Sequence, residues 1–126
     1  MRIAISTWEG NISPVFDVAR SLLVVDIKDG MEKERTQKSL HDLKIARRAS
    51  YLKQLRINVL VCGALSSTLE ERICESGVKV IAFTCGEADE VLHTIIAGKF
   101  NDQSFLMPGC RRREHIGSVF SEVNEI

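Results

Sequence analysis

The stretch "INVLVCGALSSTLEERICESGVKVIAF", residues 57–83, decides the fold of this chain. Two apolar runs, residues 57–62 and 78–83, have the length and composition of buried strands. Between them, Ser67 and Glu70 have the spacing of a capping box, which predicts a helix. A strand, a helix and a strand in this order predict two parallel strands joined by a right-handed crossover.

The sequence on either side of this unit extends the pattern. Downstream, residues 87–97 form a second amphipathic helix whose acidic first turn complements the positive end of the helix dipole. Upstream, apolar residues at helical spacing predict a helix over residues 42–55. The first 39 residues predict three strands instead: residues 2–6, residues 21–27 and a polar edge strand over 31–39. The Asp29-Gly30 pair predicts a hairpin turn between the last two.

Together these elements predict an α/β fold with three layers, α/β/α, on a mixed five-stranded sheet. Residues 1–100 form the domain, and residues 101–126 form a C-terminal tail that we expect to be mobile or partly helical. Helical spacing of apolar residues supports a terminal helix, at Ile116, Val119, Phe120 and Val123.

Composition narrows the classes of function. Lys plus Arg and Asp plus Glu number 17 each, so net charge gives no general attraction to nucleic acid or anionic membrane. The sequence shows neither the apolar region of a signal peptide nor a run long enough to span a membrane. We therefore expect a cytoplasmic protein whose four cysteines are reduced thiols.

Two of these cysteines follow the predicted parallel strands. Cys62 precedes Gly63, and Cys85 precedes Gly86. Ligands of open α/β sheets bind outside the carboxyl ends of the strands, and the glycines would let backbone approach a ligand closely. Cys85 also precedes a helix N-terminus, which favours a thiolate. A buried core position is the other interpretation of Cys62.

The other two cysteines differ from each other. Cys74, inside the helix after residue 67, is predicted to be a small, partly buried hydrophobic residue. Cys110 follows Pro108-Gly109 and precedes the basic run Arg111–Arg113, so burial in an apolar core does not explain a cysteine at this position. If the tail folds back over the strand ends, Cys110 supplies a third thiolate beside Cys62 and Cys85. The arginines would offset its charge or form a solvated run, and His115 is a candidate fourth ligand.

Four segments carry a resemblance to a known family: "MRIAIS", "ISPVFDVARSLLVVDIKDG", "VLVCGALSSTLEE" and "VKVIAFTCGEADEVLHTIIAGKF". They resemble the dinitrogenase iron–molybdenum cofactor biosynthesis family, the NifX-like domain, over about residues 1–100. "FLMPGC" with its basic run resembles a cysteine-bearing subgroup. The resemblance implies a ribonuclease H-like fold and a role in binding or carrying iron–sulfur or molybdenum-containing clusters, exchanged with cluster-assembly or acceptor proteins.

The chain differs from the pattern of this family in one loop. Many relatives carry a Ser-x-His-Phe pattern after the first strand, whereas this chain has Ser13-Pro14-Val15-Phe16-Asp17 without a histidine. Thiolate ligation by Cys62, Cys85 and Cys110 is the natural substitute, since soft thiolates select iron–sulfur centres, copper(I) or zinc.

Two other classes of function compete with a cluster carrier. A nuclease needs clustered carboxylates for two-metal chemistry, and the strands over residues 2–6 and 57–62 carry none, so we reject it. A regulatory or ligand-binding module without metal remains open, because helix N-termini and glycines can hold a small ligand. No catalytic residue set is predicted.

Overall fold

The structure, a computed structural model, describes residues 1–112, 116, 119 and 120. Its elements are, in chain order, β1 (Arg2–Trp8), β2 (Asn11–Ile12), the 3-10 helix η1 (Phe16–Val18), β3 (Ser21–Lys28), β4 (Met31–Ser39), α1 (Ile45–Gln54), β5 (Val59–Val61), α2 (Ser67–Glu75), β6 (Lys79–Ile81) and α3 (Ala88–Ile96).

One mixed sheet joins all of these strands. Its order is β4-β3-β1-β5-β6, with β1, β5 and β6 parallel and β1, β3 and β4 antiparallel. The prediction of five strands is wrong by one, because β2 pairs with β1 as a sixth. Glu9 and Gly10 both have positive φ (50° and 83°), as a two-residue hairpin turn of type I′ requires. Glutamate seldom adopts this conformation, so the sequence did not signal the turn.

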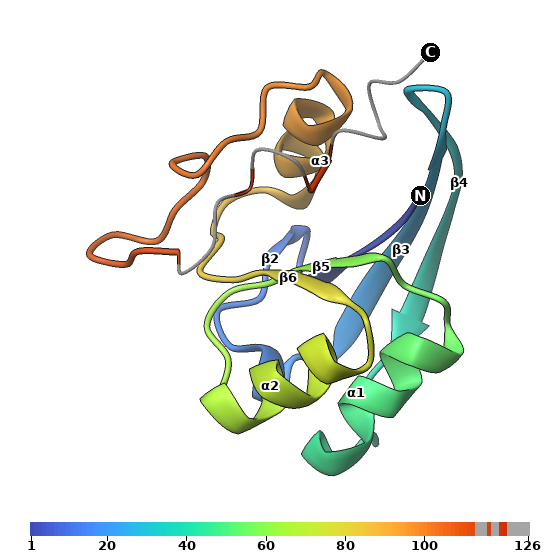
Figure 1. Ribbon diagram of the computed structural model, residues 1–126, viewed down its shortest axis with the longest axis vertical. Coiled ribbons are helices and arrows are strands. Elements are labelled where there is room, and N and C mark those ends of the chain that lie inside the picture. The colour runs from blue at the N-terminus through green and yellow to red at the C-terminus, as the bar shows by residue number, and fades with distance from the viewer. Residues whose placement is uncertain (113–115, 117–118, 121–126) are drawn as a thin grey trace.

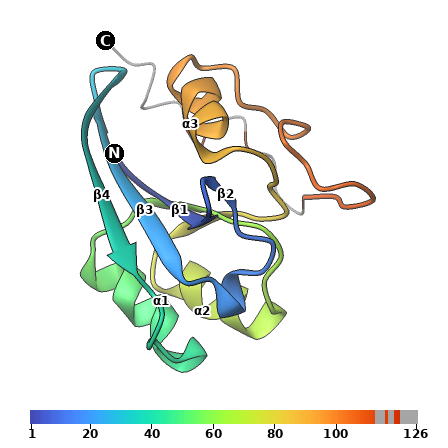
Figure 2. The ribbon, with the colours of Figure 1, turned by 180° about the vertical axis from the view of Figure 1, so that it is seen from behind.

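The sheet separates two apolar cores, which confirms the three-layer α/β/α arrangement. Helices α1 and α2 cover one face and α3 covers the other (Figures 1 and 2). Alternation along β1 serves both faces: Ile3 and Ile5 belong to the core under α3, and Ala4 belongs to the core under α1 and α2. The central strands are therefore apolar on both faces, as buried parallel strands are.

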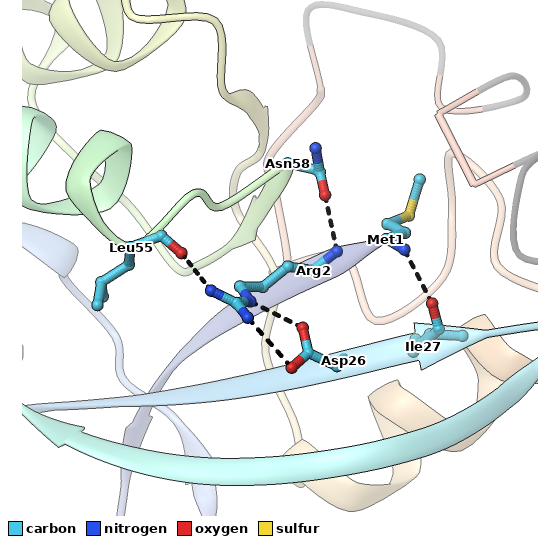
Figure 3. A network of polar contacts seen from close by, with 6 residues as sticks. All are labelled: Met1, Arg2, Asp26, Ile27, Leu55 and Asn58. Carbon is cyan, nitrogen blue, oxygen red and sulfur yellow. Dashed lines mark hydrogen bonds and ion pairs between the residues drawn. The ribbon is translucent and has the colours of Figure 1, made fainter.

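A polar network closes the end of the sheet where β1, β5 and β6 begin (Figure 3). The Arg2 guanidinium donates to the Asp26 carboxylate at 2.7 and 3.3 Å and to the Leu55 carbonyl at 2.7 Å. The Arg2 N–H donates to Asn58 Oδ1, and the N-terminal ammonium donates to the Ile27 carbonyl. Asp26 is thus paired with Arg2 at this end of the sheet, which lies opposite the end where Cys62 and Cys85 follow the strands.

The N-termini of two helices, α1 and α2, differ from the prediction. Helix α2 begins at Ser67, but its N-cap is Ser66 and no side chain makes the cap bond, so the capping box is wrong. The Ser66 N–H instead donates to the Asp17 carboxylate at 2.9 Å. A partner from another loop therefore fixes the start of α2. The predicted helix over 42–55 is shorter, since residues 42–44 precede α1.

The described part of the tail packs against the domain. Ile116 and Phe120 are buried in the core under α3, and the Phe120 ring meets the Phe100 ring edge-on at 5.5 Å between centroids. Two of the four apolar positions expected on a terminal helix are thus core residues. Val123 and most of that predicted helix lie outside the described residues.

Candidate functional site

The loops that follow β1, β5 and β6 meet at one end of the sheet. The Ile12 N–H donates to the Gly86 carbonyl at 2.8 Å, which ties the loop after β1 to the loop after β6. The Phe83 N–H donates to the Gly63 carbonyl at 3.0 Å, which ties the loop after β6 to the loop after β5. The predicted meeting point of the cysteine-bearing loops therefore exists.

A short segment, residues 13–17 (the 13–17 loop), lies over the end of β5. The Phe16 N–H donates to the Ala64 carbonyl and the Ala64 N–H donates to the Pro14 carbonyl, both at 2.8 Å. A Cβ atom on Gly63 would lie 2.4 Å from the Pro14 carbonyl oxygen. Gly63 is therefore glycine because the chain's own backbone approaches it, where we had expected a ligand to approach.

A buried arginine, Arg48 on α1, holds the 13–17 loop from below. Its guanidinium donates to the carbonyls of Phe16 and Ala19 at 2.8 Å each, and to those of Leu40 and Leu43 at 3.3 Å each. Its Cζ atom also lies 5.7 Å from the centre of the Phe16 ring. Burial lowers the pKa of Arg48, and the nearby Asp17 carboxylate opposes that shift. Arg48 and the Asp17–Ser66 bond thus anchor the loop at its C-terminal end.

Cys62 lies beneath this loop and is completely buried in the core under α1 and α2. Burial raises the pKa of its thiol strongly, and the charges of Glu70 and Asp17 raise it further. In this arrangement Cys62 is a neutral core residue. Ser6 on β1 faces the same side of the sheet as Ala4 and Cys62. Its Oγ is the only buried side-chain polar atom of the described residues without a hydrogen-bond partner.

Cys85 is half-buried in the loop after β6. Its N–H donates to the Phe105 carbonyl at 2.7 Å, and Thr84 pairs with Leu106 as an antiparallel bridge. Gly86 has φ +113°, and a Cβ atom there would lie 3.1 Å from the Phe105 ring. The space beside Gly86 is therefore occupied by residues from beyond the domain we predicted.

Cys110 is also half-buried, and it ends a tight turn. Its N–H donates to the Met107 carbonyl at 3.1 Å across Pro108 and Gly109, and Gly109 has φ +77°. Proline followed by a glycine of positive φ is the signature of a type II turn. The Met107 N–H donates to the Phe83 carbonyl, so the turn is fastened to the loop that carries Cys85.

Arg112 fastens the same segment. Its guanidinium donates to the carbonyls of Ala82, Asp102 and Ser104 at 2.8–3.0 Å and to Thr84 Oγ1 at 2.9 Å. Burial lowers the pKa of Arg112, and the charges of Asp102 and Cys85 oppose that shift. Arg112 is thus a structural residue, and it is bound to Thr84, the residue before Cys85. Its neighbour Arg111 is exposed, and Arg113 and His115 lie outside the described residues.

These positions do not form a ready-made ligand set. In residues 1–112, 116, 119 and 120, no three side chains of His, Cys, Asp or Glu are grouped so that they could hold a metal ion. The loops of Cys85 and Cys110 are joined through backbone hydrogen bonds, whereas Cys62 lies in the core below. Cys74 is exposed on α2, so its predicted partial burial is wrong.

Carboxylates are not gathered here either. Asp17 accepts from the Ser66 N–H, and Asp26 is paired with Arg2 at the other end of the sheet. Each of these two aspartates already has a partner of its own, and neither β1 nor β5 carries an acidic residue. Nothing in the described residues supports two-metal nuclease chemistry.

The fold and this loop cluster define a class: a small α/β/α domain with two half-buried thiols near the carboxyl end of β6. The sequence matches the family model for the dinitrogenase iron–molybdenum cofactor domain over residues 1–98, and the chain belongs to that family. Residues 99–112, with Cys110 and Arg112, lie beyond the matched region.

Solved structures agree with the fold. The crystal structure of PH0822 has a TM-score of 0.74 at 20% identity, over 79% of this chain and 91% of that one. The protein mj0327 from Methanocaldococcus jannaschii has TM-scores of 0.62 (crystal, 21% identity) and 0.60 (NMR, 22%), over 79% of this chain and 90% or 89% of its own. No curated protein matches the sequence. The helices of the described residues are too short or too polar to cross a bilayer.

Proposed function

We propose that this protein binds and carries an iron–sulfur or molybdenum-containing cluster during the biosynthesis or trafficking of the iron–molybdenum cofactor. The observation that carries the proposal is the pair of half-buried thiols, Cys85 and Cys110, on loops joined by one short β-ladder in a chain of this family. Thiolates are the ligands that iron–sulfur clusters prefer. A reducing cytoplasm would keep both thiols available.

The cluster is cargo rather than a permanent cofactor in this proposal. Two half-buried thiols leave coordination positions open, which suits a cluster that must be received from an assembly protein and passed to an acceptor. Cys62 is the third donor, and it becomes available only when the 13–17 loop lifts from Gly63. The buried, unpartnered Ser6 hydroxyl faces the same side of the sheet as Cys62 and would be uncovered with it.

Two positively charged side chains lie next to the cysteine-bearing loops. The Arg112 guanidinium is held by four hydrogen bonds beside the loop of Cys85, and a fixed cation stabilises an anionic cluster bound next to it. Arg111, which is exposed, adds a second positive charge next to Cys110.

Anaerobic reconstitution with iron and sulfide, or with thiomolybdate and copper, tests the proposal. We expect visible charge-transfer bands that weaken in Cys85→Ala and Cys110→Ala. Cys74→Ala is the matched control, because Cys74 is an exposed cysteine on α2. Equal bands in all three variants would contradict thiolate binding at this site. Binding of a small ligand or protein with no bound metal would instead support the alternative function, a regulatory module.

A further inference from the structure

A groove runs along the free edge of β6, between α2 and three residues of the C-terminal segment, Arg112, Ile116 and Val119. Its volume is about 210 Å³. The floor is formed by β6 and the two residues after it, and the apolar walls include Ile116 and Val119. Pockets for drug-sized ligands are larger, at roughly 300–1,000 Å³, so this groove suits a few side chains rather than a small-molecule cofactor.

The backbone of β6 decides what the groove can bind. The Lys79 N–H donates to the Asn58 carbonyl, and the Ile81 carbonyl accepts from the Cys62 N–H. Both residues therefore direct their hydrogen-bonding groups toward β5. Because these groups alternate along a strand, the N–H and C=O of Val80 point away from the sheet, into the groove. Among the described residues, no backbone group forms a hydrogen bond with them.

The chain itself shows that this edge accepts an antiparallel strand. Residues 105–107 pair with residues 83–85, directly beyond β6, through the Cys85–Phe105 and Met107–Phe83 bonds. At the turn that begins with Met107 the chain leaves the edge of the sheet, and the Arg112 side chain donates a hydrogen bond to the Ala82 carbonyl. The open length of edge is therefore centred on Val80.

We propose that this groove binds an extended segment of a partner protein, added to β6 as an antiparallel strand opposite Val80. Backbone pairing gives the affinity, and the side chains on either face of the segment give the specificity. The segment runs toward Lys79, so a carboxylate opposite Lys79 is favoured. A cation two residues before the central position lies on the α2 side of the sheet, near Glu71. This docking site is independent of the metal proposal.

The register defines a probe. In the blocked peptide acetyl-Lys-Val-Val-Glu-Thr-amide, the second valine faces Val80, the glutamate faces Lys79 and the lysine lies toward Glu71. We expect it to bind the full chain and to shift the Val80 amide resonance and slow its hydrogen exchange. N-methylation of the second valine removes one of the two central hydrogen bonds and should weaken binding by about tenfold. The charge-reversed peptide acetyl-Glu-Val-Val-Lys-Thr-amide should also bind more weakly.

A variant of the protein tests the same edge from the other side. Val80→Pro removes the outward N–H at a position where an edge strand tolerates proline, and it should weaken binding of the peptide by at least tenfold. Equal affinity for the peptide and its N-methylated form would overturn the proposal without relying on any variant. A concentration-dependent dimer that protects the Val80 amide in the absence of peptide would also overturn it, because the edge would then belong to a second copy of this chain.

Discussion

Arg112→Ala should undock the segment formed by residues 99–112 from the domain. Arg112 is the point where this segment meets the loop after β6, through bonds to Ala82 and Thr84 on one side and Asp102 and Ser104 on the other. The guanidinium also lies 5.4 Å from the centre of the Phe100 ring. One substitution therefore removes contacts to both partners at once.

The size of the effect follows from those contacts. A hydrogen bond from a charged group contributes about 1.5–3 kcal/mol, and a cation–π contact about 0.5–1 kcal/mol at an exposed site. Arg112 is only half-buried, so water can replace much of what is lost. We expect a loss of about 2–3 kcal/mol in the free energy of unfolding. Arg112→Lys should recover little of it, because a single ammonium cannot reproduce the guanidinium fork.

Urea denaturation measures the loss, and hydrogen exchange locates it. The amides of Cys85 and Met107 hold the ladder between the segment and the domain, so their exchange should accelerate more than that of the β1 amides. Arg111→Ala is the matched control and should change stability by less than about 0.5 kcal/mol, because Arg111 is exposed. If Arg112→Ala and Arg111→Ala behave alike, the anchoring role of Arg112 is refuted.

Three further outcomes are expected. Arg48→Ala should lower the free energy of unfolding, measured by urea denaturation, by about 3–5 kcal/mol, because it leaves buried carbonyls without donors. Arg47→Ala is the control and should have little effect, because Arg47 is exposed. A small loss in Arg48→Ala would contradict the anchoring role. Asp17→Ala should raise the alkylation rate of Cys62 about five- to tenfold. The substitution removes the hydrogen bond to the Ser66 N–H, which is worth about 1 kcal/mol, so the 13–17 loop opens more often. An unchanged rate would disprove that this loop controls access to Cys62. The pH dependence of stability should also report Cys62. Burial raises its pKa above that of the unfolded chain, so the stabilisation is complete below about pH 8.5 and is lost at about 1.4 kcal/mol per pH unit above it. Cys62→Ala should reduce this slope and Cys74→Ala should not.

The sequence predicted those parts of the fold that depend on local pattern. Two apolar runs separated by a segment of helical periodicity predicted the parallel strands β5 and β6. The Asp29-Gly30 pair predicted the β3–β4 hairpin, in which both residues have positive φ. The meeting of the strand-end loops followed from parallel strand direction alone. These features depend on neighbours in sequence, so one sequence suffices to predict them.

The residues that sequence analysis missed are those whose partners are remote. Arg112 belongs to a basic run, which by itself indicates a solvated surface, and its role depends on acceptors 8 to 30 residues away. Arg48 carried a usable signal: it precedes Leu52 and Leu55 by four and seven residues, so it lies on the apolar stripe of its helix. A cation on that stripe needs buried acceptors, and the carbonyls around Phe16 provide them.

The glycines illustrate a related ambiguity. Gly63 and Gly86 were expected to admit a ligand, and both do sit where a side chain would be crowded. Their close neighbours are the 13–17 loop and Phe105, which are parts of the same chain. Sequence pattern shows that space is needed beside a strand end, but only tertiary structure shows what fills it.

The metal and sulfide content of the protein purified without oxygen tests the central claim most directly. The account predicts stoichiometric iron with sulfide, or molybdenum, that is lost in a Cys85→Ala/Cys110→Ala double variant and retained in Cys74→Ala. Protein that is folded and metal-free under these conditions, and stays so after incubation with iron and sulfide or with thiomolybdate, would contradict a cluster carrier.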